Sequence, residues 1–249
     1  MLAGWLAEGL PPATVWVVEP KPSDWLRTTG VHLNEELPER PAIVLVAVKP
    51  QMMTDALPTL AAMGNGDTVF ISVAAGLTLV RFEEILGQRI PVIRAMPNTP
   101  AAISQGITAI VGNAHAGADA LDEADTLLAA IGDVVRLEAE AQIDAVTGVS
   151  GSGPAYVFHM IETMAAAGVE QGLPADLAMQ LAKATVAGAG ALAQGAEADP
   201  SLLRVDVTSP NGTTQAALEV LMDETSGFPA LLSRAVKAAT DRSRELANG

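Results

Sequence analysis

Cysteine is absent from this sequence of 249 residues, which excludes disulfide frameworks, thiolate metal sites and cysteine nucleophiles. Histidine is nearly as scarce, and three scattered residues do not indicate a metal centre, so we expect no metal ligands. Basic side chains are also few, because 14 Lys and Arg stand against 29 Asp and Glu, a net charge of −15. Nucleic acid is therefore not an expected partner, since it is bound by clustered Lys and Arg.

Long apolar runs are lacking too. None approaches the roughly 18 residues that a membrane-spanning helix needs, and the first residues have no basic segment of the kind that opens a signal peptide. Hydrophobic residues make up 49% of the chain and charged residues 17%, which argues against disorder. We expect a soluble cytoplasmic protein with no membrane partner and with room for one large or two modest domains.

The sequence pattern changes near residue 140, and it predicts two domains, 1–139 and 140–249. In the first, short β-branched runs alternate with amphipathic windows, which is typical of a parallel sheet covered by helices. The apolar run 42–48 predicts a strand buried on both faces. The other predicted strands are 15–18, 68–73, 90–94, 107–111 and 134–137, and the predicted helices are 52–63, 79–86 and 118–131.

The second domain is expected to be entirely helical. Small residues dominate 184–193, and they allow another helix to approach closely. That approach is either a helix crossing within one subunit or a dimer interface, and both remain open. His159 lies in an apolar window, and we expect it in the core. The predicted helices of this domain are 155–171, 175–194, 215–223 and 228–247.

Two segments follow predicted strands of the first domain, where ligands bind in open α/β sheets. Ala47-Val-Lys-Pro50 ends the apolar run, and its backbone could face a flat ligand while Lys49 reaches a phosphate or ribose. In Arg94-Ala-Met-Pro-Asn-Thr-Pro100, two prolines hold Asn98 and Thr99 in an extended loop. Ordinary strand-ending turns would explain the same residues.

Two further segments begin helices of the second domain. In Ser150-Gly-Ser-Gly-Pro-Ala-Tyr156, Ser152 is a potential helix cap and Pro154 suits the first turn. In Val207-Thr-Ser-Pro-Asn-Gly-Thr-Thr-Gln215, hydroxyl groups and the free N–H groups of a helix beginning near Thr214 favour an anion. No Lys or Arg lies in that loop, which favours a small carboxylate over a phosphate. A plain helix cap is the alternative.

Four segments in this order strongly resemble pyrroline-5-carboxylate reductase, and the resemblance extends over essentially the whole chain. It implies an α/β Rossmann-type parallel-sheet domain followed by an all-helical dimerisation domain. It also implies an oxidoreductase of proline biosynthesis, which transfers a hydride from NAD(P)H to the C=N carbon of 1-pyrroline-5-carboxylate and gives L-proline. The segments are Ala47-Val-Lys-Pro-Gln51, Arg94-Ala-Met-Pro-Asn-Thr-Pro-Ala101, Gly148-Val-Ser-Gly-Ser-Gly-Pro-Ala-Tyr156 and Val207-Thr-Ser-Pro-Asn-Gly-Thr-Thr214.

The resemblance also assigns site residues. Thr214 would lie close to the ring nitrogen as the orienting or proton-donating catalytic group, and Glu197 near the substrate. The expected cofactor is NADPH, with NADH as an alternative: Glu19 would suit a ribose diol, whereas Lys21 and Ser23 could hold a 2′-phosphate. The expected substrate-binding residues are Glu197, Ser209, Gly212, Thr213 and Thr214, and the expected cofactor-binding residues are Asn34, which would open a helix, Ala47, Val48, Lys49, Pro50, Asn98 and Thr99.

The chain departs from the family pattern at two places. Asn211 stands where the family loop usually has glycine, but asparagine tolerates left-handed backbone angles. At the front, the family has a strand and a Gly-x-Gly-x-x-Gly loop before a helix resembling 1–10, and this sequence has neither. We therefore expect 1–139 to be an N-terminally truncated dinucleotide-binding domain that starts at an internal Met. Without the central strand, two strand edges should be unpaired.

Two other functions stay open at this point. Another Rossmann-plus-helical imine or β-hydroxyacid reductase would carry a catalytic Lys or Asp in 155–171, where this chain offers His159 and Glu162. A non-catalytic oligomerising remnant would bind no cofactor, because the glycine loop is missing. For either enzyme the partner is a small molecule. The resemblance implies a homodimer through the helical domain, with a decamer of assembled dimers as a further state.

Overall fold

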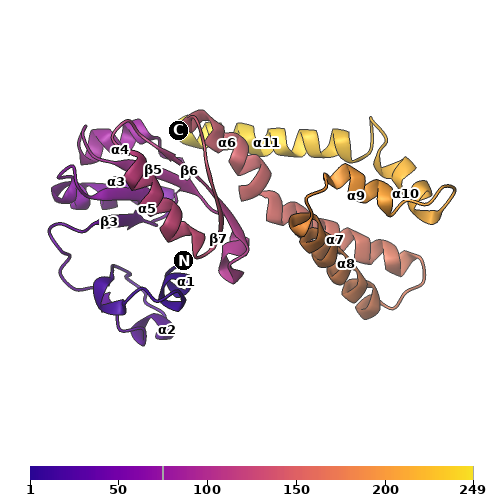
Figure 1. Cartoon of the computed structure of the whole chain (residues 1–249), viewed down its shortest axis with the longest axis horizontal. Coiled ribbons are helices and arrows are strands. Elements are labelled where there is room, and N and C mark those ends of the chain that lie inside the picture. Colours follow the sequence, from indigo (N-terminus) through magenta and orange to yellow (C-terminus); the bar gives the residue numbers. More distant parts are fainter. Residues whose placement is uncertain (75, 249) are drawn as a thin grey trace. The chain divides into compact units, whose positions relative to one another are not determined.

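The computed structural model describes residues 1–74 and 76–248, with all side chains except those of Pro50 and Asn248. The chain forms two compact units (Figure 1). The first contains Met1–Gly151 and the chain from Thr240 onward, and the second contains Ser152–Ala239. The predicted boundary after residue 139 is based on the change in composition, whereas the units are defined by packing and divide after Gly151.

A mixed five-stranded sheet forms the centre of the first unit, in the order β3-β4-β5-β6-β7. β3, β4 and β5 are parallel to one another, and so are β6 and β7, but β5 and β6 are antiparallel. The sheet is parallel as predicted except at that pair, where the connection 97–105 is shorter than the dozen or more residues of a parallel crossover. The strands are β3 (Ile43–Val46), β4 (Val69–Ser72), β5 (Val92–Met96), β6 (Gly106–Gly112) and β7 (Gly132–Arg136).

Helices cover both faces of this sheet (Figure 1). Successive strand residues point to opposite faces, so Phe70 packs with Phe82 of α4, whereas Ile71 packs in the other cluster with Leu128 of α5. The predicted helix 52–63 is α-helical only over α3, because Pro58 lies in the 3₁₀ turn that follows it. The bounds are α3 (Met53–Ala56), α4 (Leu79–Leu86), α5 (Ala118–Ala129) and α6 (Ile143–Val146), the last followed by a π-helical turn, Thr147–Gly151.

The first residues form a separate two-stranded parallel sheet, β1 with β2. As predicted, an edge of β1 and an edge of β3 are unpaired among the described residues. The prediction that the run 42–48 is buried on both faces is wrong: only Val46 of β3 is buried, because the strand lacks a neighbour on one side. The elements here are α1 (Leu2–Ala7), β1 (Trp16–Val17), α2 (Asp24–Arg27) and β2 (His32–Leu33).

Helices make up the described secondary structure of the second unit, as predicted. α7 and α8 pack through small side chains, among them Ala165, Ala178 and Ala182. His159 is not in this core: its side chain is 75% exposed, because only a narrow face of α7 is covered. The helices are α7 (Gly153–Glu170), α8 (Ala175–Gly195), α9 (Pro200–Asp206), α10 (Thr213–Leu221) and α11 (Phe228–Asn248).

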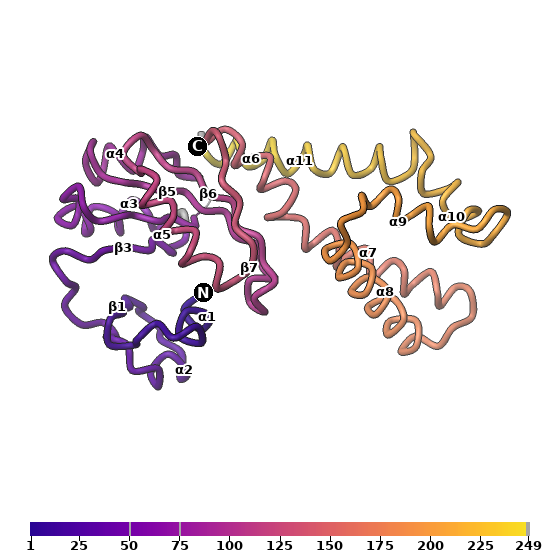
Figure 2. The backbone as a smooth tube through the Cα atoms, in the orientation of Figure 1, coloured from indigo at the N-terminus to yellow at the C-terminus, as the bar shows by residue number. Residues whose placement is uncertain are grey.

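The end of α11 belongs to the first unit and lies beside α6 (Figure 2). Ser243 donates its hydroxyl proton to Asp144 of α6 at an O–O distance of 2.6 Å.

Among the described residues, no helix has the length and apolar character needed to cross a membrane.

Asn113 joins three parts of the first unit just after β6. Its Oδ1 accepts hydrogen bonds from the N–H groups of Val92 and Ala116, at 3.1 and 3.0 Å. Its Nδ2 donates to the carboxylate of Glu83 on α4 at 2.7 Å and to the carbonyl of Ile90 at 2.9 Å. One amide therefore connects α4 with the antiparallel pair β5 and β6.

We predict that Asn113→Asp lowers the free energy of unfolding by about 3 kcal/mol at neutral pH. The substitution removes both bonds that Nδ2 donates and places a second carboxylate against Glu83. Urea unfolding followed by circular dichroism measures the loss, which should shrink at acidic pH as the new carboxyl group is protonated.

Asn65→Asp is the matched control. Oδ1 of Asn65 accepts from the N–H groups of Asp67 and Thr68, and aspartate retains that oxygen. Its stability should change by less than about 0.5 kcal/mol. Equal losses in the two variants would contradict the role assigned to the Nδ2 bonds of Asn113.

Candidate functional site in two units

The carboxyl ends of β3, β4 and β5 meet at one edge of the first unit, because these neighbouring strands are parallel. We call this the carboxyl edge; it consists of the connections 47–52, 73–78 without residue 75, and 97–105. Val73 donates its N–H to the carbonyl of Val46 at 3.2 Å, so the second connection starts against the end of β3. Ligands of open α/β sheets bind at such edges.

Ala47, Val48 and Lys49 form the first connection. Ala47 and Lys49 are exposed, and Val48 is half-buried against the cluster that contains Phe70. Pro50 begins a 3₁₀ turn, Pro50–Met52, and its side chain lies outside the described part of the chain. The arrangement places an exposed cation, Lys49, just after the end of β3.

Asn98 and Thr99 lie in the third connection, but the two residues differ in their contacts. Nδ2 of Asn98 donates to the carbonyl of Ser150 at 3.2 Å, and Oδ1 accepts from the N–H of Ile107 at 3.0 Å. Asn98 thus ties the π-helical turn to the start of β6. Thr99 is exposed at the start of a 3₁₀ turn, Thr99–Ile103.

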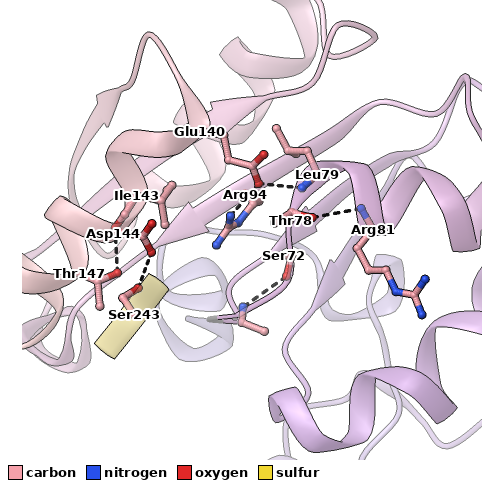
Figure 3. Close-up of polar contacts among 11 residues, drawn as sticks. Ser72, Thr78, Leu79, Arg81, Arg94, Glu140, Ile143, Asp144, Thr147 and Ser243 are labelled. Carbon is pink, nitrogen blue, oxygen red and sulfur yellow. Dashed lines mark hydrogen bonds and ion pairs between the residues drawn. The ribbon is translucent and has the colours of Figure 1, made fainter. Parts of the chain in front are cut away.

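Arg94 and Glu140 form an ion pair beside this edge that the sequence reasoning missed (Figure 3). The guanidinium of Arg94 lies 2.6 Å from Oε1 of Glu140, and the same oxygen accepts the N–H of Leu79 at 2.7 Å. A signal was present, because an arginine between apolar strand residues needs a buried counter-charge. Nothing in the sequence identified which carboxylate supplies it.

Asn34 does not open a helix, and that prediction is wrong. It follows β2 with φ +55°, and its amide pairs with the backbone of Glu19: Oδ1 accepts the N–H at 2.9 Å and Nδ2 donates to the carbonyl at 3.0 Å. The Glu19 carboxylate accepts the N–H of Lys21, and the Ser23 hydroxyl caps α2 by accepting the N–H of Leu26. Asparagine suits the left-handed angle, and residues 35–38 after it form no helix.

His32 of β2 lies beside these residues. Its ring stacks on Trp16 with centroids 4.4 Å apart. The hydrogen bond to the Glu35 carboxylate raises the pKa of His32 above its ordinary value. The stack gives this end of β1 and β2 a flat aromatic surface.

In the second unit, Ser209, Gly212, Thr213 and Thr214 lie together where α10 begins. Gly212 is the N-cap and supplies no side-chain bond, so the first N–H groups of α10 have no side-chain cap. Ser209 and Thr213 are exposed and Thr214 is half-buried. Asn211 has φ +59°, which confirms that it tolerates the left-handed position, and its N–H donates to Oε1 of Gln215 at 2.7 Å.

Glu197 lies between α8 and α9 and is exposed. Nearby, the pKa of Asp199 is lowered because its carboxylate accepts hydrogen bonds from Ser201 at the start of α9. Hydrogen bonds from Thr225 and Ser226 lower the pKa of Asp223 more strongly. Both aspartates are therefore ionised at neutral pH and cap turns, so neither is suited to donate a proton. Ser152, the predicted cap of α7, makes no capping bond.

No cluster of three or more potential metal ligands occurs among the described residues. The two groups of candidate residues are polar and mostly uncharged, which suits binding and orientation more than metal or covalent chemistry.

Comparison with known proteins identifies the relatives of this chain. Residues 140–246 match the family described as pyrroline-5-carboxylate reductase dimerisation. Over 99% of its length, the chain is 40% identical to pyrroline-5-carboxylate reductase of Pseudomonas aeruginosa, covering 92% of that protein. The chain belongs to the pyrroline-5-carboxylate reductase family.

Relatives and solved structures of pyrroline-5-carboxylate reductases from other organisms are similar over most of the chain. The Arabidopsis thaliana enzyme is 43% identical over 90% of this chain and 80% of its own. The Coxiella burnetii structure has a TM-score of 0.91, with 32% identity over 99% of this chain and 93% of that one. A Plasmodium falciparum structure with NADP bound has a TM-score of 0.79 and 25% identity, over 93% and 87% of the two chains.

The residues present fit the nicotinamide end of a dinucleotide. At the carboxyl edge, half-buried Val48 provides apolar surface, and exposed Lys49 and Thr99 provide donors. The turn after β1 carries the Glu19 carboxylate, and the stacked Trp16 and His32 rings lie on β1 and β2. The sequence has no Gly-x-Gly-x-x-Gly turn, so we assign no residue to the pyrophosphate.

We predict that Asn98→Asp loosens one side of the carboxyl edge. Aspartate keeps an acceptor for the N–H of Ile107 but loses the bond donated to Ser150. Amide hydrogens of 147–151 should therefore exchange faster in mass spectrometry while β6 stays protected. Asn98→Ala removes both bonds and should speed exchange at both places. Unchanged exchange of 147–151 in Asn98→Asp would show that the Nδ2 bond does not hold this turn.

Proposed function

We propose that this protein reduces 1-pyrroline-5-carboxylate to L-proline. The observation that carries the proposal is the start of α10, where N–H groups without a side-chain cap follow a loop that contains Ser209, Thr213 and Thr214 and no basic residue. Such a helix start binds anions, and a site built from neutral donors suits one small carboxylate.

The residues of the chain act by binding and orienting the reactants. A protonated cyclic imine is already a good hydride acceptor, so positioning is the main requirement. NADPH, when bound, supplies the hydride. Ser209, Gly212 and Thr213 hold the substrate carboxylate, Thr214 holds or donates a proton at the ring nitrogen, and Glu197 contributes to the substrate site.

The carboxyl edge holds the nicotinamide and its ribose in this proposal. Ala47, Val48, Lys49 and Pro50 supply one wall, and Thr99 an exposed hydroxyl. Asn98 acts mainly through the turn it holds, since both ends of its amide are bonded within the protein. Asn34 likewise positions Glu19. NADP in the Plasmodium falciparum structure supports NADPH, with NADH as the alternative.

The test is oxidation of NADPH with pyrroline-5-carboxylate by the 249-residue chain and by Thr214→Val. We expect turnover by the parent protein and a loss in kcat of roughly a hundredfold in the variant, because valine keeps the shape and removes the hydroxyl. Thr126→Val on α5 is the control and should be unchanged, because the Thr126 hydroxyl donates to the Asp122 carbonyl of its own helix.

Fluorescence titration with NADPH separates the alternatives. Saturable binding without turnover of pyrroline-5-carboxylate would favour another reductase. Absence of binding would favour a non-catalytic oligomerising remnant. Either result overturns the proposed function of this chain.

We also propose that the second unit forms a homodimer. α7 and α8 expose large apolar side chains, among them Phe158 at 59%, Leu181 at 48% and Leu192 at 61%. At Gly188 and Gly190 of α8, an added Cβ would meet no atom within 4 Å. Exposed apolar surface of this kind favours a partner, and the dimerisation family match covers both helices.

Gly190→Leu should shift the protein toward monomer in sedimentation velocity, because the added side chain fills the space for a second helix. Helix content by circular dichroism should stay the same, since the position is open within one chain. Thr126→Leu adds the same side chain to exposed α5 and should leave the oligomer unchanged. A parent protein that is monomeric at micromolar concentration would refute the dimer, and a sedimentation coefficient far above that of a dimer would indicate a decamer.

A further inference from the structure

Arg94 is a buried charge that the proposed reaction does not use; only 7% of the residue is exposed. It lies on β5 between two apolar clusters on the same sheet face. Val92, two residues earlier, packs with Phe82 in one cluster, and Met96, two residues later, packs with Ile143 in the other. The guanidinium therefore occupies the seam between α4 and α6.

Stability alone gives a weak reason for a charge in that seam. Apolar residues of similar volume commonly replace a buried ion pair with no loss of stability. The ion pair instead fixes the position of the Glu140 carboxylate. Arg94 holds Oε1 of Glu140 where the same oxygen accepts the N–H of Leu79, the first residue of α4 (Figure 3).

The bond to Leu79 fixes the end of the β4–α4 connection, which the sequence reasoning left out of the site. β4 lies between β3 and β5, so this connection lies between the segments 47–50 and 98–99. Its start is held by the N–H of Val73 on Val46, and an added Cβ at Gly76 would come within 3.3 Å of the Leu246 carbonyl. Glu140 supplies a contact at the end of the connection.

Glu140 also begins the chain stretch that ends at the π-helical turn. Asn98 holds that turn through Ser150. One carboxylate thus links the second connection of the carboxyl edge to a stretch that is bonded to the third. A shift of Glu140 would displace both.

We propose that Glu140, held by Arg94, is a positioning residue that sets the β4–α4 connection for binding the nicotinamide cofactor. The proposal rests on the proposed function. It assigns to the pair no contact with substrate or cofactor.

Leu79→Pro tests the decisive bond. Proline at the first helical position removes only an N–H that helices leave free, and Thr78 before it is extended, at φ −87° and ψ 158°, as proline requires. Leu79→Ala is the matched control, because it loses the same apolar packing and keeps the N–H. We expect Leu79→Pro to bind NADPH roughly tenfold more weakly than Leu79→Ala, the effect of one hydrogen bond to a charged group.

A second pair of variants separates positioning from stability. Arg94→Met with Glu140→Gln should unfold at nearly the urea concentration of the parent protein, yet bind NADPH about tenfold more weakly. The KM for pyrroline-5-carboxylate should stay within about twofold of the parent value, because the variant remains folded and its candidate substrate-binding residues are unchanged. Arg81→Met with Glu84→Gln removes the exposed ion pair of α4 and should change none of these values.

The outcomes are distinguishable. If the parent protein binds no NADPH, the proposed function fails. If it binds, but Leu79→Pro and Leu79→Ala bind equally, the positioning role is overturned. Loss of stability with unchanged NADPH affinity in the Arg94 and Glu140 double variant overturns it as well.

Discussion

Burial of one guanidinium constrains the first unit of this protein. Arg94 is buried on one face of the sheet between two apolar clusters, and a buried charge needs a partner of opposite charge. Glu140 meets that need from the stretch that leaves the sheet after β7. Oε1 of Glu140 also accepts the N–H of Leu79. The same carboxylate therefore pairs with the Arg94 charge and holds the end of the β4–α4 connection of the carboxyl edge.

In the proposed function, the two units carry different groups of candidate residues. The first has the carboxyl edge, where Ala47, Lys49 and Thr99 are exposed, and the second has a helix start with hydroxyl groups and no side-chain cap. Among the described residues of either unit, no group of three or more potential metal ligands occurs. An iminium accepts hydride without further activation, so geometry is the main contribution that such a protein makes. The scarcity of charged and thiol side chains suits that chemistry.

Local patterns predicted much of the fold. The window 79–86 is α4, and the limits of α7 and α8 lie within two residues of the expected ones. Errors occurred where a distant neighbour decides the result. His159 was expected in a core, but apolar helix residues are buried only where another element covers them. The run 42–48 was expected to be buried because its apolar pattern does not show that one edge lacks a strand.

By itself the sequence determined the helix and strand types, the four motifs and hence the family, because these depend on residue order and local spacing. Tertiary structure alone decided that β6 runs antiparallel to β5, that Asn34 holds Glu19, and that Glu140 is the partner of Arg94. A charged residue between apolar residues of a strand indicates that a counter-charge lies nearby. Which of 29 acidic residues provides it depends on how the chain returns to the sheet, 46 residues later.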